Sequence, residues 1–314
     1  MTSIDPRNIV DLHSALLQDL RSSGSIDFAP GSVTPILRHD FKMKVPDDPS
    51  KTVVTNDSGS RMGVLICSHT ANPGLIARSV ERAIQSKQKL GDQLGSVILD
   101  PIVHGHFQGL SYVIWPPHRT LSSSRTLKYI QKQWLISRVL SWLRDVTEAT
   151  KTVDVNDGLQ SCYLLSLKQI TRDAQLPDHF AVIAATGIER LESQTWRPAT
   201  TLEHGDFWVE NLLLPQAVRN DYGFLVIDWA GAKLEGHPFF DLLRVSMSSG
   251  LNLRRLRDEI VAHCSILQCE TADVPLYILA ALGSIALNPE HLPRPRYLSM
   301  AQRLLFTLSS ALQQ

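Results

Sequence analysis

Two short apolar segments late in the chain constrain its fold most, because polar, oxygen-rich side chains bound each of them. Residues 212–214 read LLL and residues 224–227 read FLVI, and apolar runs of this length are typical of buried strands. The loop between them is polar and contains Asn220, Asp221 and Gly223, which are common turn residues. The pattern therefore predicts a β-hairpin.

Three polar residues flank the open end of this predicted hairpin. Asn211 enters the first strand, Asp228 leaves the second, and Asp206 lies on the loop five residues before Asn211. Antiparallel pairing would bring Asn211 and Asp228 to the same end. A carboxylate and a carboxamide that converge offer the hard oxygen ligands that Mg²⁺ takes when phosphates supply the rest. A further carboxylate can orient an attacking hydroxyl and receive its proton, so the arrangement fits phosphoryl transfer.

The same segments resemble the aminoglycoside phosphotransferase and choline kinase family. HGDFWVEN at residues 204–211 and VIDW at residues 226–229 match its HGDxxxxN and hydrophobic-Asp-Trp motifs, and Gly236, Pro238 and Asp241 follow as in its GxPxxDL. The resemblance implies an α+β, two-lobed, protein-kinase-like fold. A small antiparallel-sheet lobe is expected over residues 1–117, and a larger, mostly helical lobe over residues 118–314. In that family an acidic residue often follows the Asp-Trp pair, whereas this chain has Ala230 there. The difference weakens only the case that this position helps to hold a second metal or a loop.

The resemblance also assigns roles to single residues. Asp206 is expected to be the catalytic base, with Asn211 and Asp228 as ligands of Mg²⁺. His204 is expected to brace the catalytic loop, and Asp241 to tie its helix to that loop. Taken alone, such residues are more often caps, turn residues or partners of the backbone. Their joint spacing is what favours a site.

The first third of the chain predicts the sheet-rich lobe. Residues 1–23 carry an amphipathic helical pattern, strands are expected at residues 35–45, 51–55 and 62–67, and a helix is expected at residues 75–90.

In the family that the chain resembles, a strand lysine binds nucleotide phosphates and pairs with a helix glutamate. Glu81 lies where that glutamate is expected, but the strand at residues 63–69 reads GVLICSH and has no lysine. Either Lys42 or Lys44 reaches the phosphates from the preceding strand, or both are solvated and nucleotide binds weakly or not at all.

Residues 110–124, LSYVIWPPHRTLSSS, resemble the last strand of the small lobe and the hinge that follows it. There the Pro116 carbonyl is expected to accept a hydrogen bond from the adenine base and the His118 amide to donate one, because proline has no N–H. Trp115 either walls the pocket or belongs to the core. Beyond the hinge, apolar periodicity predicts helices at residues 126–150, 178–191, 253–267, 274–287 and 296–312.

Composition limits the class of partner. Lys and Arg total 31 and Asp and Glu also total 31, so no charge bias indicates a nucleic acid or an anionic membrane. No apolar run approaches the roughly 20 residues that span a bilayer, and residues 1–20 lack the apolar core of a signal peptide. We therefore expect a cytoplasmic protein. The four cysteines, and His104 with His106, lack the spacing of a zinc site.

These features predict a Mg²⁺-requiring phosphotransferase that moves the γ-phosphoryl group of ATP or GTP to a hydroxyl of a small molecule such as a sugar, an aminoglycoside or an amino alcohol. The alternative is a pseudokinase-type module that has lost the phosphate-binding lysine and binds a nucleotide or a protein. A protein side chain is a less suitable acceptor, because no activation segment is recognisable between residues 229 and 236. Nothing in the sequence separates ATP from GTP or indicates an oligomeric state.

Overall fold

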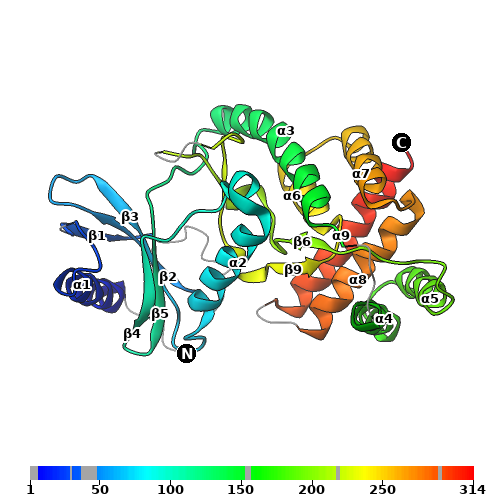
Figure 1. The fold of residues 1–314 in the computed structure, drawn as a ribbon, viewed down its shortest axis with the longest axis horizontal. Coiled ribbons are helices and arrows are strands. Elements are labelled where there is room, and N and C mark those ends of the chain that lie inside the picture. Colours follow the sequence, from blue (N-terminus) through cyan, green and yellow to red (C-terminus); the bar gives the residue numbers. More distant parts are fainter. Residues whose placement is uncertain (1–5, 29, 37–47, 153–156, 217–219, 289–291) are drawn as a thin grey trace. The chain divides into compact units, whose positions relative to one another are not determined.

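The computed structural model describes residues 6–28, 30–36, 48–152, 157–216, 220–288 and 292–314, and the chain forms two compact units (Figure 1). Unit 1 comprises residues 1–87, 96–121 and 212–230, and unit 2 comprises residues 88–95, 122–211 and 231–314. This division differs from the single boundary expected after residue 117, because the hairpin within residues 212–230 shares its core with the first unit.

Unit 1 contains a five-stranded antiparallel sheet with the strand order β1-β2-β3-β5-β4. Its strands are β1 (Ser32–Pro35), β2 (Ser50–Thr55), β3 (Arg61–Cys67), β4 (Val103–Phe107) and β5 (Leu110–Trp115). The strands predicted at residues 51–55 and 62–67 are confirmed as β2 and β3. Of the strand predicted at residues 35–45, residues 37–45 lie outside the described residues, and β1 ends at Pro35.

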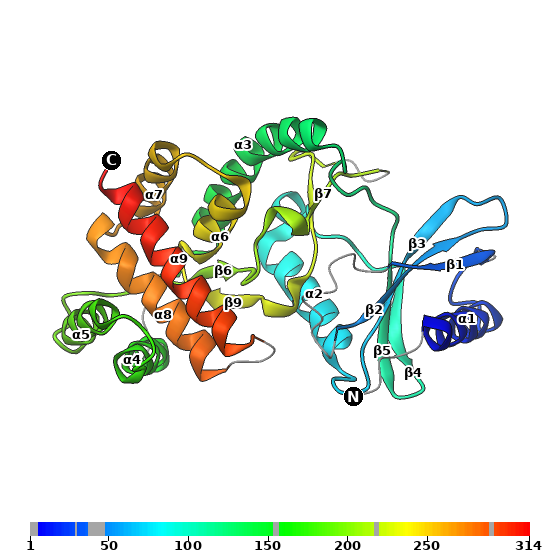
Figure 2. The same ribbon diagram turned by 180° about the vertical axis from the view of Figure 1, so that it is seen from behind.

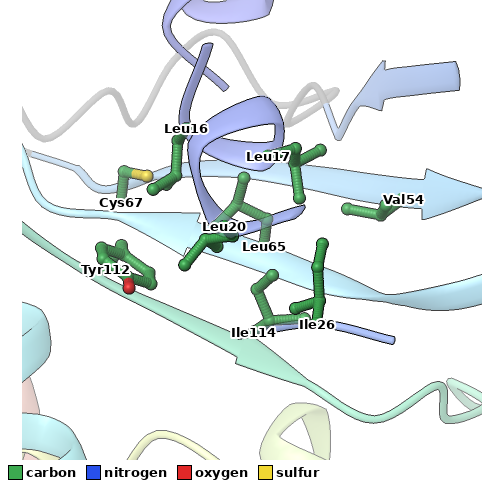
Figure 3. Packing of buried hydrophobic residues seen from close by; sticks show 9 residues of the cluster. All are labelled: Leu16, Leu17, Leu20, Ile26, Val54, Leu65, Cys67, Tyr112 and Ile114. Atoms are coloured by element: carbon green, nitrogen blue, oxygen red, sulfur yellow. The ribbon is translucent and has the colours of Figure 1, made fainter. Parts of the chain in front are cut away.

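Helix α1 (Pro6–Ser22) covers one face of this sheet. In Figure 3 the side chains of Leu16, Leu17 and Leu20 point from α1 toward the sheet, where they pack against Leu65 and Ile114. His13 of α1 is buried, and its Nδ1 lies 2.5 Å from Oγ1 of Thr52. The amphipathic pattern at residues 1–23 thus corresponds to a helix whose apolar side packs on the sheet.

Helix α2 (Leu75–Gly95) packs against the opposite face, and Gly91 interrupts it with a φ of 69°. Ile76 and Val80 of α2 contact Val113, while the neighbouring Ile114 faces α1. Successive side chains of a strand point to opposite faces, which explains this division.

The predicted hairpin is confirmed as β7 (Leu212–Leu213) and β8 (Leu225–Val226), which pair antiparallel with Leu212 opposite Val226. Its side chains share a small core with Leu99 and Trp115. The N–H of Val226 also donates to the carbonyl of Val97. The hairpin is therefore anchored to unit 1 through its second strand.

Unit 2 is mostly helical. Its helices are α3 (Arg125–Thr150), α4 (Asp157–Arg172), α5 (Asp178–Glu192), α6 (Phe240–Ser249), α7 (Leu253–Leu267), α8 (Val274–Leu287) and α9 (Arg294–Leu312). Helix α8 is apolar on most of its surface, and α4, α5 and α9 pack around it, as Figure 2 shows. This packing buries its apolar side chains. Helix α4 was not predicted, and neither was the two-stranded sheet of β6 (Thr201–Glu203) and β9 (Lys233–Gly236).

The length and hydropathy of the described helices determine whether one of them could cross a membrane. None of them is both long and apolar enough on its own, and residues 253–267 with residues 271–287 meet the length and composition only as a pair bent by 100°.

Candidate active site

The tight loop after β6 carries the first candidate residues, His204, Gly205 and Asp206, within unit 2. Gly205 has a φ of +81°, and a Cβ there would lie 2.6 Å from the carbonyl oxygen of Gly231. Only glycine fits both the left-handed backbone and this close approach. Gly231 follows Asp228 by three residues, so the loop lies against the segment that continues from Asp228.

Asp241, near the start of α6, holds this loop. Its Oδ2 accepts the N–H of His204 at 2.6 Å and its Oδ1 accepts the N–H of Gly205 at 3.0 Å, so Asp241 connects α6 with the loop. Burial and the charge of Glu203 raise the pKa of Asp241 to about 7, against the effect of these two donors. His204 is buried, and its Nδ1 accepts the N–H of Asp206 at 3.2 Å.

The two oxygens of Asp206 have different surroundings. Oδ1 accepts hydrogen bonds from Nε1 of Trp208 and from Nη2 of Arg244. Oδ2 has a contact with Nδ2 of Asn211 at 3.4 Å, and the Asp206 side chain is 47% exposed. One oxygen is thus held by two donors, whereas the other has only the long contact with Asn211.

Arg244 is a residue of this site that the sequence reading missed. Its side chain is 8% exposed, and its guanidinium lies 3.8 Å from the centre of the Trp208 ring. Burial lowers the pKa of Arg244, and Asp206 acts in the opposite direction. Asp241 and Arg244 are three residues apart on one helix, and residues with that spacing share a face. This spacing was the available signal.

Asn211 ends a short 3₁₀ helix, Val209–Asn211, directly before β7. Its Nδ2 donates to the carbonyl of Asp206 at 2.9 Å. The side-chain Oδ1 has no donor among the described residues, so it is available to a cation.

Asp228 lies in unit 1, two residues after β8. Its backbone is left-handed, with a φ of 69°, and the turn is fixed by the buried Trp229, whose Nε1 donates to the carbonyl of Val226 at 3.1 Å. Asp is one of the few residues that adopt this conformation readily. The Asp228 side chain is exposed and binds none of the described residues.

The donor chemistry of Asn211 and Asp228 fits Mg²⁺, which prefers carboxylate and amide oxygens and keeps open positions for water and phosphate. Among the described residues, no group of three or more His, Cys, Asp or Glu side chains could hold a metal ion by itself. Each of the two side chains therefore offers one oxygen of the kind that a phosphate-assisted Mg²⁺ site uses.

Of the residues predicted to lie at the nucleotide phosphates, Lys42, Lys44 and Glu81, only Glu81 is among the described residues. Lys42 and Lys44 lie outside the described residues. Glu81 is exposed, and its Oε1 accepts Nε2 of Gln85 at 3.2 Å. It lines a cavity of about 570 Å³ together with His104 and His106. The structure therefore shows no lysine partner for Glu81 among the residues it describes.

Two residues of the predicted hinge follow β5. The ring Nδ1 of His118 donates to the carbonyl of Pro116 at 3.1 Å, and burial lowers the pKa of His118. The N–H of His118 bonds to none of the described residues. A carbonyl with a second lone pair and a free amide are thus present at this position.

The buried residue directly before His204 is Glu203, and its partners are His237 and Lys233. Oε2 of Glu203 accepts the N–H of His237 at 2.6 Å, and Nζ of Lys233 lies 3.7 Å from its Oε1. Burial alone would raise the pKa of Glu203, but Lys233 and His237 outweigh it and lower the pKa to about 2. Glu203 is therefore a fixed negative charge next to Asp241.

Solved structures of other proteins share the fold of this chain. No family model and no curated protein matches the chain. Among solved structures, the GDP complex of aminoglycoside 2'-phosphotransferase-IIIa has a TM-score of 0.56 and 13% identity, covering 96% of this chain and 99% of that one. Choline kinase LicA from Streptococcus pneumoniae has a TM-score of 0.52 and 12% identity, covering 95% of this chain and 99% of that one.

The chain has the fold of these kinases. This confirms the expected α+β, protein-kinase-like architecture, with an antiparallel sheet in one unit and a mostly helical second unit.

Proposed function

We propose that this protein is a Mg²⁺-requiring phosphotransferase that moves the γ-phosphoryl group of ATP or GTP to a hydroxyl of a small molecule. The observation that carries the proposal is the state of Asp206, with Oδ1 held by Arg244 and Trp208 and Oδ2 left without a strong donor. A carboxylate fixed in this way is suited to accept a proton from a hydroxyl.

In the proposed reaction, the acceptor hydroxyl donates a hydrogen bond to Oδ2 of Asp206 and gives up its proton there as its oxygen bonds to phosphorus. The γ-phosphoryl group leaves the nucleotide, and the nucleoside diphosphate keeps the electron pair of the broken bond. Arg244 and Trp208 restrict the rotation of the carboxylate, which keeps Oδ2 in place for the hydroxyl.

Asn211 and Asp228 are the proposed holders of Mg²⁺, which when bound neutralises phosphate charge. The pairing of β7 with β8 supports this, because Asn211 directly precedes one strand and Asp228 follows the other by two residues. The approach of Gly205 to Gly231 also supports it, since Gly231 follows Asp228 by three residues.

The base of the nucleotide would bind at Pro116 and His118, through the carbonyl of the first and the free N–H of the second. The acceptor remains a sugar, an aminoglycoside or an amino alcohol. Asp241 does not favour a cationic acceptor, because it is buried and both its oxygens accept backbone N–H groups.

Two measurements test this function. Thermal unfolding with ATP or GTP, with and without Mg²⁺, is expected to show metal-dependent stabilisation by one nucleotide, as ligand binding to the folded state requires. Phosphoryl transfer to a panel of small hydroxyl compounds is then compared between the wild type, Asp206→Asn and the loop control Asp221→Asn.

Asp206→Asn is expected to keep the nucleotide response and to lose turnover by about a hundredfold or more, the usual contribution of a positioned base. Asp221→Asn should behave as the wild type. Wild-type turnover in Asp206→Asn removes the assignment of the base. No stabilisation by either nucleotide favours the pseudokinase-type module that binds a protein.

A further inference from the structure

Strand β3 carries no cation on the face that α2 covers. Ile66 packs against Ile76 and Val80 of α2, and Val64 shares its face by the alternation of a strand. Leu65 lies on the α1 side, and Arg61 is at the exposed start of the strand. A nucleotide bound beside α2 therefore meets apolar side chains where kinases place a phosphate-binding lysine.

A different cation faces the segment that continues from Asp228. Arg82 of α2 donates Nη1 to the carbonyl of Ala230, across 148 residues of sequence, and its side chain is half-buried. Ala230 follows Asp228 by two residues. Helix α2 thus presents an arginine to the turn that carries a proposed metal ligand.

Glu81, the neighbour of Arg82, points elsewhere. It is exposed and lines the cavity that His104 and His106 also line. Consecutive residues of a helix point about 100° apart, so one of the two faces Ala230 and the other does not. The residue turned toward the segment after Asp228 is therefore Arg82, whereas Glu81, which lies where the resemblance expects the partner of the strand lysine, lines the cavity.

The charge of Arg82 has no partner of opposite sign within the part of the chain that the structure describes. A guanidinium has five N–H donors, and the carbonyl of Ala230 occupies one. A partly desolvated cation is stabilised by an anion. On the same helix, Lys87 is paired with a carboxylate, that of Asp100, at 2.6 Å, while Arg78 and Lys89 donate to the neutral oxygens of Asn72 and Leu234. Of these cations, Arg82 is the one whose bond leads to the turn after Asp228.

We propose that Arg82 binds the phosphates of the nucleotide in place of a strand lysine, and that its bond to Ala230 positions the turn after Asp228. This inference rests on the proposed function. The planar guanidinium matches phosphate oxygens in a two-pronged geometry, which leaves one edge for the carbonyl.

The test compares Arg82→Met, Arg82→Lys and the control Arg78→Met, which lies one turn earlier on α2. Lys42→Met with Lys44→Met serves as the rival variant. Calorimetry in Mg²⁺ gives the Kd of each protein for the nucleoside triphosphate that the wild type binds and for the matching nucleoside. The melting temperature of each free protein reports on folding.

Arg82→Met is expected to weaken triphosphate binding about tenfold or more, the effect of one lost charge-assisted contact, while nucleoside binding stays the same. Arg82→Lys should recover most of the affinity, and Arg78→Met should match the wild type. Wild-type affinity in Arg82→Met overturns the inference, as does an equal loss for nucleoside and triphosphate, or a loss found only in the Lys42 and Lys44 variant. A wild type that binds no triphosphate refutes the proposed function itself.

Discussion

Arg244 anchors Asp206 from the protein side. The guanidinium lies over the Trp208 ring, with 3.8 Å to the ring centre, and donates to the same oxygen, Oδ1, that accepts the Nε1–H of Trp208. Arg244 is nearly buried and Asp206 is about half exposed, so the pair joins the interior to a surface carboxylate. The contact between cation and ring adds to the rigidity of this arrangement.

Arg244→Met is therefore expected to lower kcat by about ten- to hundredfold, because Asp206 loses its strongest donor and its orientation. The KM for the nucleotide should change little, since Arg244 touches no residue assigned to nucleotide binding. Steady-state kinetics with a reactive acceptor measures both values, and Arg257→Met, an exposed arginine of α7, is the control. A variant in which KM rises and kcat holds would contradict this role.

Local patterns predicted the parts of the structure that depend on neighbours in sequence. The hairpin at residues 212–226 followed from two apolar runs and a polar loop, and β2 and β3 followed from their alternation. Helix α4 had a readable signal as well, because Tyr163, Leu167 and Ile170 are buried at helical spacing. The sequence pattern alone would therefore have supported a prediction of this helix.

Other parts depend on contacts between distant residues. Strand β9 reads KLEG and has no apolar run, so its pairing with β6 depends on Gly236, where a Cβ would meet Glu203. Arg244 lies 38 residues from Asp206, and Arg82 lies 148 residues from Ala230. A single sequence does not show which distant residue satisfies a charge, and these partners became visible only in three dimensions.

Gly205→Ala is expected to destabilise the protein by about 2–5 kcal/mol, because the left-handed backbone costs about 1–2 kcal/mol and the overlap with Gly231 adds to it. Gly59→Ala is a matched control, since Gly59 has a φ of +78° and no atom within 4 Å of the position that a Cβ would take. Gly59→Ala should lower the free energy of unfolding only by the cost of the left-handed backbone, about 1–2 kcal/mol. Urea unfolding measures both, and equal losses would show that the approach to Gly231 is unimportant.

Asp228→Asn tests the metal site without disturbing the turn. Asparagine tolerates the left-handed conformation of Asp228, so the melting temperature should remain close to that of the wild type. Loss of the carboxylate is expected to raise the Mg²⁺ concentration for half-maximal activity about tenfold or more. A Mg²⁺ titration of activity checks this, with Asp57→Asn in the β2–β3 turn as control. An unchanged titration would exclude Asp228 as a ligand.

Glu203 and Asp241 affect stability in opposite ways as the pH changes. The pKa of Asp241 is raised by burial and by Glu203 from 3.8 to about 7, so the folded protein keeps a proton that the unfolded chain has lost. Asp241 therefore lowers stability progressively as the pH rises between these two values. The pKa of Glu203 is lowered from 4.5 to about 2, so its contribution is full above 4.5 and is lost as the pH falls toward 2.

Glu203→Gln removes the charge that raises the pKa of Asp241. The free energy of unfolding of the variant should be lower at neutral pH, by about 1–3 kcal/mol for the lost charged bonds, and it should fall less than that of the wild type between about pH 4 and 7. His237 changes the slope in the same direction, because loss of Glu203 lowers its pKa further. Urea unfolding across this range measures the slope, and Glu192→Gln, an exposed residue, is the control. A slope equal to that of the wild type would mean that Glu203 does not act on Asp241.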